Sequence, residues 1–69
     1  MMRWLRLRRM RRAFRALSER DRAIFGSVRF DDLDYIQTAR RHGCTVAEVE
    51  QTVARVLIAL DRAARGKRP

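Results

Sequence analysis

Few side chains in this 69-residue sequence could do covalent chemistry, and they do not form a recognisable group. His42 is the single histidine and Cys44 the single cysteine, and no serine, histidine and carboxylate are arranged as a nucleophilic triad. A lone histidine lacks the further ligands that a zinc site requires, and a lone cysteine is more typical of a small buried hydrophobic residue than of a reactive thiol. No glycine-rich phosphate loop is present. We therefore expect no enzyme, no metal and no cofactor, and we expect binding in place of catalysis.

Positive charge is the strongest chemical feature of the sequence, and it is concentrated at the two ends. Lysine and arginine number 17 against 8 aspartate and glutamate residues, which gives a formal net charge of +9. Residues 1–17 contain seven arginines and no acidic residue, and residues 62–69 contain four basic residues. Residues 18–61 carry six arginines against eight acidic residues. Attraction to a polyanion is therefore expected from the ends, because the middle is mildly acidic.

The length limits the protein to one small domain, which buries only roughly 60% of its unfolded surface. One cysteine cannot form an internal disulfide. No apolar run approaches the roughly 20 residues of a membrane span, and the N-terminus lacks the apolar core of a secretory signal. We therefore expect a cytoplasmic protein.

Residues 1–17 have the pattern of an amphipathic, cationic helix. The apolar residues follow a 3, 3, 4, 3 spacing at Trp4, Leu7, Met10, Phe14 and Leu17. Arginines elsewhere on the helical wheel include Arg6, Arg8, Arg9, Arg12 and Arg15. Three interpretations remain open. The apolar stripe packs on the body of the domain and the arginines are solvated; the arginines lie along nucleic-acid phosphates, where counterion release adds affinity; or the helix lies on an anionic membrane surface, which suits Trp4 and the arginines.

Two helices joined by a glycine turn are predicted between Leu33 and Leu60. Acidic residues at positions 31, 32 and 34 favour a helix start, and Gly43 after three basic residues favours its end. The apolar edge of this first helix is predicted at Leu33, Ile36 and Ala39. Thr45 and Glu48 have the spacing of a capping box, so the second helix is expected to begin at Val46. Its buried stripe is predicted at Val46, Val49, Val53, Val56 and Leu60. The pair predicts a helix-turn-helix.

The segment before this pair is predicted to form a helix that begins at Ser18, because residues 18–21 also have a capping pattern. The helix pattern weakens at Gly26 and Ser27, which are poor residues for the middle of a helix. Phe30 is expected to anchor the following link in the core.

The second half of the last helix is apolar around most of its circumference, so it must be covered on more than one side. The N-terminal helix or a second copy of the chain would cover it. The predicted partner interface consists of Val56, Leu57, Ile58 and Leu60. The predicted fold is an all-α domain of three to four helices. Its parts are a basic amphipathic helix at 1–17, a helix-turn-helix domain at 18–62 and a basic tail at 63–69.

Four runs of residues in the middle of the chain form a distinctive combination. They are Leu17-Ser18-Glu19-Arg20-Asp21-Arg22-Ala23-Ile24-Phe25, then Arg29-Phe30 before an acidic turn, then Leu33-x-Tyr35-x-x-x-Ala39-x-x-x-Gly43-x-Thr45, then Val49-Glu50 with Val53-Ala54-Arg55. From Leu17 to about Leu60 the chain resembles region four of bacterial sigma factors, in its extracytoplasmic-function, iron-citrate-type form. Thr38 stands where that family has a large aliphatic residue and His42 where it has leucine, which predicts altered packing of the helix pair.

The resemblance implies a domain that reads the −35 promoter element and docks on the flap of RNA polymerase. The sequence lacks the region that binds core polymerase, so we expect that it is not a complete sigma factor. We predict a small transcription regulator that binds DNA through the helix-turn-helix, with basic arms on phosphates. The alternative is a protein-interaction module that mimics region four and binds RNA polymerase, a sigma factor or an anti-sigma factor. A homodimer through the last helix is compatible with both.

The predicted DNA contacts lie on the first turns of the second helix and on the turn before it. The residues expected to face the groove are Ala47, Glu48, Gln51, Thr52 and Arg55, and those expected near phosphates are Arg40, Arg41 and Thr45. Gln51 would pair with an adenine edge, and Glu48 or Glu50 would accept from a cytosine amino group. Arg55 would reach phosphate or guanine. In the alternative interpretation Glu48 only closes the capping box, and the two arginines at 40 and 41 only complement the helix dipole.

Overall fold

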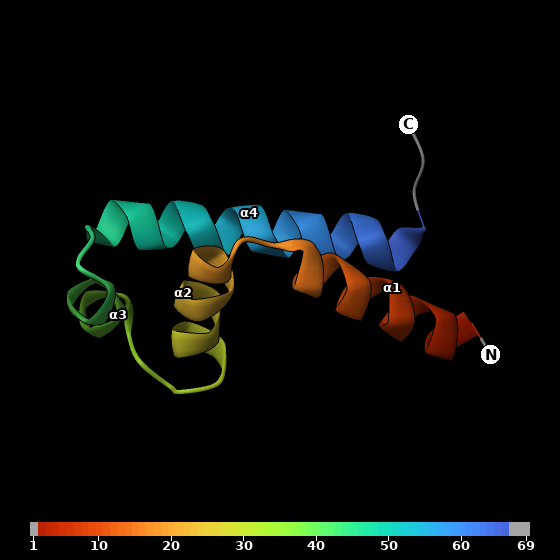
Figure 1. Cartoon of the computed structure of the whole chain (residues 1–69), viewed down its shortest axis with the longest axis horizontal. Coiled ribbons are helices and arrows are strands. Elements are labelled where there is room, and N and C mark those ends of the chain that lie inside the picture. Colours follow the sequence, from red (N-terminus) through yellow and green to blue (C-terminus); the bar gives the residue numbers. More distant parts are fainter. Residues whose placement is uncertain (1, 67–69) are drawn as a thin grey trace.

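The computed structural model describes residues 2–66, which form four helices (Figure 1). They are α1 (Met2–Ala16), α2 (Glu19–Arg29), α3 (Tyr35–His42) and α4 (Val46–Arg65). No strand occurs within residues 2–66, so the predicted all-α fold is confirmed. None of the described helices combines the length and the apolar character that crossing a membrane requires. The predicted basic tail begins inside α4, and its residues 67–69 lie outside the described residues.

The longest helix, α4, has the other three helices packed on one side of it (Figure 1). α1 runs antiparallel along the C-terminal half of α4, α2 crosses its middle, and α3 lies at its N-terminal end. The molecule measures 40 × 24 × 17 Å along its principal axes. Within the described chain the opposite side of α4 is not covered by another helix, so a partner can approach it there.

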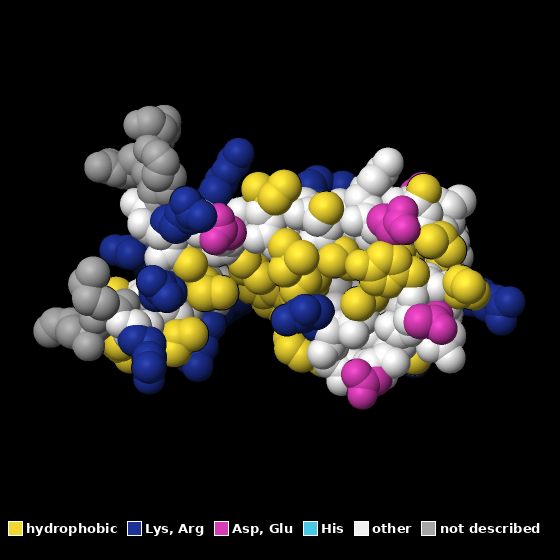
Figure 2. All heavy atoms as spheres, turned by 180° about the vertical axis from the view of Figure 1, so that it is seen from behind, with side chains coloured by type: hydrophobic (Ala, Val, Ile, Leu, Met, Phe, Trp, Pro, Cys, Tyr) yellow, Lys and Arg dark blue, Asp and Glu magenta, His cyan; other side chains and the backbone are white. Residues whose placement is uncertain are grey.

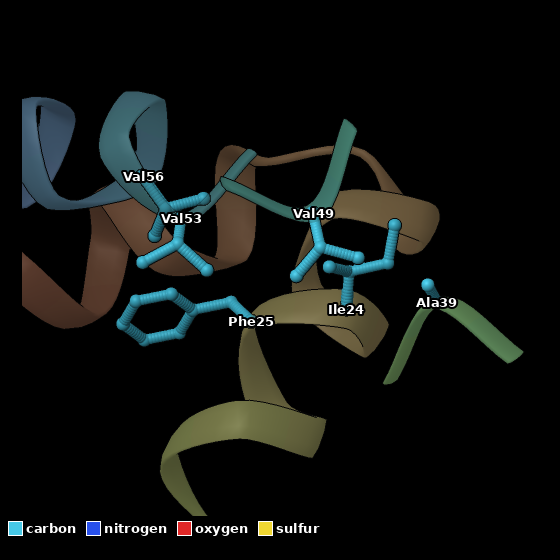
Figure 3. Packing of buried hydrophobic residues seen from close by; sticks show 6 residues of the cluster. All are labelled: Ile24, Phe25, Ala39, Val49, Val53 and Val56. Carbon is cyan, nitrogen blue, oxygen red and sulfur yellow. The ribbon is translucent and has the colours of Figure 1, made fainter. Parts of the chain in front are cut away.

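The hydrophobic core lies where α2, α3 and α4 meet (Figure 3). Its buried side chains are Ile24 and Phe25 from α2, Ala39 from α3, and Val49, Val53 and Val56 from α4. Phe14 and Leu17, at the end of α1, pack against this cluster. The rings of Phe14 and Phe25 have centroids 6.1 Å apart, within the range of a favourable aromatic pair. The last turn of α1 therefore belongs to the core.

Side chains cap the starts of α2 and α3, as the sequence predicts. The hydroxyl of Ser18 accepts a hydrogen bond from the backbone N–H of Asp21 at 3.0 Å. Asp34 caps α3, because its carboxylate accepts from the N–H of Gln37 at 2.7 Å and the Gln37 side chain accepts from the N–H of Asp34 at 3.0 Å. This second pair is a complete capping box, although the sequence analysis identified only its acidic residue.

One expectation about the region after Ser18 needs correction. The helix pattern weakens at Gly26 and Ser27, but α2 continues through both residues, and the Ser27 hydroxyl donates to the carbonyl of Ala23 at 3.0 Å. The prediction that Phe30 anchors the link in the core is wrong, since its side chain is 73% exposed. Phe25 is the buried phenylalanine of this region. The rings of Phe25 and Phe30 form a T-shaped pair, with centroids 6.5 Å apart.

The apolar edge predicted for α3 is also wrong in part. Ile36 is 55% exposed, whereas Thr38 is fully buried. The face of α3 that packs inward consists of Tyr35, Thr38, Ala39 and His42, which follow the i, i+3, i+4, i+7 spacing of one helix side. The two positions that depart from the sigma-factor pattern are thus both on this face. The His42 ring nitrogen Nε2 lies 2.9 Å from the Ser27 hydroxyl, which joins α3 to α2 by a polar contact.

Of the two covers for α4 that the sequence left open, the structure shows the N-terminal helix packed on α4, although the apolar stripe of α1 is only partly buried. Trp4 is 58% exposed and Leu7 is 46% exposed. The end of α1 is held by Arg22 of α2, whose guanidinium donates to the carbonyls of Arg15 at 2.9 Å and Leu17 at 2.7 Å. These bonds satisfy carbonyl groups that a helix C-terminus leaves free.

Candidate nucleic-acid interface

The turn between α3 and α4 has the geometry that its glycine predicts. Gly43 adopts the left-handed conformation, with φ 63°, and its N–H points back to the carbonyls of Ala39 and Arg40. The N–H of Cys44 also bonds the Ala39 carbonyl, at 3.0 Å. Only a residue without a β-carbon adopts this φ without strain, so Gly43 sets the angle at which α4 leaves the turn. The half-buried Cys44 packs against the core, as expected of a small hydrophobic residue.

The first half of α4 presents one face to solvent and one to the core. Ala47, Gln51 and Ala54 are exposed on the side that no other described helix covers. Thr52 was predicted to face the groove, but it is 3% exposed. It lies three residues after Val49 and therefore on the same buried side of the helix. Thr52 is thus a packing residue, and Ala54, which the sequence analysis did not select, takes its place on the exposed face.

Glu48 is engaged in the capping box of α4. Its backbone N–H donates to the Thr45 hydroxyl at 3.0 Å, and its carboxylate accepts from the Thr45 N–H at 2.9 Å. The hydrogen bond from the Thr45 backbone lowers the pKa of Glu48, and the positive charge of Arg20 lowers it further. Both effects favour the charged carboxylate at the end of α4 where the helix dipole is positive. This geometry matches the alternative interpretation, in which Glu48 only closes the capping box.

Two of the three arginines expected at the DNA surface form ion pairs within the chain. The Arg55 guanidinium lies 2.9 Å from the Asp21 carboxylate, which is mostly buried, and this pair joins α4 to α2. Arg41 lies 3.0 Å from the exposed Asp31 carboxylate. Arg40 is exposed and forms no ion pair within residues 2–66. Asp21 lies 34 residues before Arg55 in the sequence, so no local pattern could have revealed this pair.

The arginines of α1 do not act as one group. Arg8, Arg12 and Arg15 line a cleft of about 320 Å³ together with Arg11 and Trp4. The Arg9 guanidinium instead lies close to the backbone of Gly66, at the C-terminal end of α4, where it would complement the helix dipole. Arg6 is exposed and does not line this cleft. Most basic side chains on the face shown in Figure 2 gather at the end where α1 begins, and most acidic ones lie toward the other end.

The apolar residues of the predicted partner interface lie on different sides of α4. Val56 is fully buried in the core, so its assignment to an interface is wrong. Its position three residues after Val53 and seven after Val49 places it on the core side. Leu57 is 44% exposed and Ile58 is 55% exposed. Leu60 is half-buried and lines a separate groove.

This apolar groove, of about 270 Å³, lies between α1, α2 and α4. Its apolar lining consists of Leu7, Met10, Phe14, Phe25, Phe30 and Leu60, and Arg11 and Arg15 also line it. Figure 2 shows that hydrophobic side chains form a band along the middle of one face of the molecule. The groove is therefore a second candidate surface for a partner, distinct from the exposed side of α4.

A short helix, a left-handed glycine turn and a longer capped helix with an exposed first half define the chain as a helix-turn-helix domain. The family model described as Sigma-70, region 4 matches residues 7–60, which is most of the chain. The chain belongs to this family, whose domain is a DNA-binding helix-turn-helix and is regulatory, not catalytic. Such domains contact DNA and also RNA polymerase or anti-sigma factors. No curated protein and no solved structure shows a significant match.

Proposed function

We propose that this protein is a small transcription regulator that binds DNA with the first half of α4 in the major groove. The observation that carries the proposal is the exposed face formed by Ala47, Gln51 and Ala54 after the Gly43 turn. The two alanines leave room for the helix to approach base edges closely. Gln51 stands between them with an amide that can donate to and accept from an adenine at once. The motifs from Leu17 to Arg55 support a domain of the extracytoplasmic-function, iron-citrate type.

Contacts to phosphates would come from residues at the edge of this face. Arg40 is free of ion pairs within the described chain, and Thr45 stands at the N-terminus of α4. Glu48 and Glu50 bring negative charge close to the same surface, which opposes phosphate binding. Arg55 would have to break its ion pair with Asp21 before it could contact DNA. The affinity of this face is therefore expected to be modest and to depend only weakly on salt, because few cations contact phosphates.

The experiment is a selection of duplexes from a random library, followed by binding measurements on the selected site and a scrambled site. Gln51→Ala is expected to reduce the preference for the selected site by roughly 1–3 kcal/mol, the value of one bidentate base contact. Ile58→Ala, compared at concentrations where light scattering gives a monomer, is the matched control, because it changes an exposed residue of the same face about 10 Å further along the helix. The proposal fails if no duplex binds at low salt or if both variants behave alike.

The apolar groove supports a second function, the binding of a protein. Phe30 is 73% exposed, and it lines the groove together with Leu7 and Met10. A large apolar surface of this kind in water marks a site that a partner covers. Partners of the family's kind are RNA polymerase, a sigma factor or an anti-sigma factor. Phe30→Ser is expected to abolish recovery of such a partner while duplex binding is kept. Unchanged recovery would count against the groove.

A homodimer through Leu57 and Ile58 is compatible with either function. Light scattering across a concentration series tests it, and a monomer at every concentration would exclude it. Leu57→Ser is expected to remove any dimer without disturbing the core, because the side chain is 44% exposed and lies outside the core cluster.

A further inference from the structure

The basic cleft on α1, lined by Trp4, Arg8, Arg11, Arg12 and Arg15, is a cluster of like charges without compensation. Residues 1–17 contain no acidic residue, and none of these arginines forms an ion pair within residues 2–66. Four guanidinium groups around one cleft of about 320 Å³ repel one another. An anion with several phosphate groups would relieve this repulsion, and guanidinium groups bind phosphate oxygens in a bidentate manner.

The cleft also contains the only tryptophan of the chain. The guanidinium of Arg8 lies over the Trp4 ring, 5.0 Å from its centroid. Trp4 is nevertheless 58% exposed. The exposed part of the ring offers a platform for a planar, uncharged group. An aromatic ring beside several arginines is the combination that proteins use for single strands, with bases stacked on the ring and phosphates on the cations.

The orientation of α1 separates this cleft from the helix-turn-helix. No residue of α4 lines the cleft, and α1 packs on the side of α4 that is opposite to its uncovered face (Figure 1). A duplex held on the exposed side of Gln51 therefore does not lie against the cleft. The cleft extends from residue 4 to residue 15, about 16 Å of helix, which accommodates only a short run of nucleotides.

We propose that the α1 cleft is a second nucleic-acid site that takes a single strand, with phosphates on the four arginines and an unpaired base on Trp4. A duplex would offer phosphates but no free base face to the ring. A membrane surface fits less well, because the arginines share the face of Trp4, whereas Leu7 and Met10 face the apolar groove. The site goes beyond the proposed promoter-type contact and does not depend on it.

Fluorescence of the intact chain tests the proposal, because Trp4 is the single tryptophan and reports on the cleft alone. The probes are a thymidine oligonucleotide of about 10 nucleotides, a duplex of equal length, inorganic tripolyphosphate and vesicles with anionic headgroups. The oligonucleotide is expected to quench Trp4 and to bind about tenfold more tightly than the duplex at equal salt. Tripolyphosphate is expected to compete without quenching, since it has no base.

Charge-matched variants separate the cleft from general basicity. Arg12→Gln is expected to lower the affinity for the single strand several-fold. It is also expected to reduce the slope of log affinity against log salt concentration by about 0.7, the contribution of one phosphate contact. Arg6→Gln removes the same charge from the same helix outside the cleft and is expected to change neither. Trp4→Leu, followed by anisotropy of a labelled strand, is expected to lose about tenfold in affinity.

Several results would overturn the proposal. They are a duplex that binds as tightly as the strand, binding without quenching, equal effects of Arg6→Gln and Arg12→Gln, and vesicles that displace the strand and shift the Trp4 emission to the blue. Gln51→Ala is expected to leave strand binding unchanged. If the protein selects duplexes but binds no single strand, only the α1 site is refuted. If it binds the single strand but selects no duplex, only the promoter-type contact of α4 is refuted.

Discussion

The buried hydroxyl of Thr38 gives the sharpest test of how this fold is held together. Thr38 is fully buried on the inward face of α3, and its Oγ1 has no hydrogen-bond partner within residues 2–66. A buried hydroxyl without a partner loses its hydrogen bonds to water on folding, which costs about 1–3 kcal/mol. Valine has nearly the same shape and a similar helix propensity, so Thr38→Val removes this cost with little change in packing.

We expect Thr38→Val to raise the free energy of unfolding by about 1 kcal/mol, which corresponds to about 4–8 °C in the melting temperature of a domain of this size. Urea and thermal unfolding followed by circular dichroism measure the change. The m-value, which is the slope of the unfolding free energy against urea concentration, should be the same for the variant and the wild type, because the surface exposed on unfolding is unchanged.

Ser27→Ala is the matched control, since Ser27 is also a buried hydroxyl, 3% exposed, but has partners. It bonds the Ala23 carbonyl at 3.0 Å and lies 2.9 Å from Nε2 of His42. Removing it leaves the His42 nitrogen without its partner and is expected to cost about 1 kcal/mol. A Thr38→Val variant with an unchanged or lower unfolding midpoint would refute the reasoning.

Three further predictions concern the caps and the end of α1. Gly43→Ala is expected to lower the free energy of unfolding by about 1 kcal/mol, because a β-carbon is strained at φ 63° even though no neighbour obstructs it, and urea unfolding measures the loss. The pKa of Glu48 is lower in the folded than in the unfolded chain, so its stabilising contribution is present above the unfolded pKa and is lost as the pH falls through the folded one. Glu48→Gln keeps the capping box without the charge, so its urea midpoint should fall below that of the wild type at pH 7, and the difference should vanish in acid. Arg22→Ala is expected to speed amide exchange in the last turns of α1 and to cost about 1–3 kcal/mol, and exchange that is uniform along the chain would contradict a local role.

The two proposed nucleic-acid surfaces of the molecule differ in charge. The exposed face of α4 carries Gln51 between alanines and has acidic neighbours, so it is suited to reading bases more than to attracting phosphates. The cleft on α1 has the opposite character, with four arginines and little capacity to distinguish bases. Because the cleft would neutralise more phosphates than the face of α4, salt should weaken its proposed binding more strongly.

Local signals in the sequence were sufficient for the helix-turn-helix. Gly43 stops α3, and Thr45 with Glu48 starts α4, because caps and turns depend on residues within a few positions of one another. The same holds for Ser18 at the start of α2. The all-α fold follows from these signals together with the spacing of the apolar residues, whereas the family rests on the motif resemblance and on the family model that matches residues 7–60.

The sequence was less informative about which residues face inward or find partners. Thr38 and Thr52 are buried although their type suggests the surface, because their positions on the helix wheel place them between apolar neighbours. Phe30 is exposed although its type suggests the core, since Phe25 already fills that place.

By itself, then, the sequence determined the capped starts of α2 and α4, the glycine stop of α3, and the concentration of positive charge at the ends of the chain. Only the tertiary structure decided that Arg55 pairs with Asp21, that Val56 belongs to the core, and that α1 packs on the side of α4 opposite to its uncovered face. The physical reason is range. Caps act within one turn of helix, whereas ion pairs, burial and the facing of surfaces depend on how distant helices pack against one another.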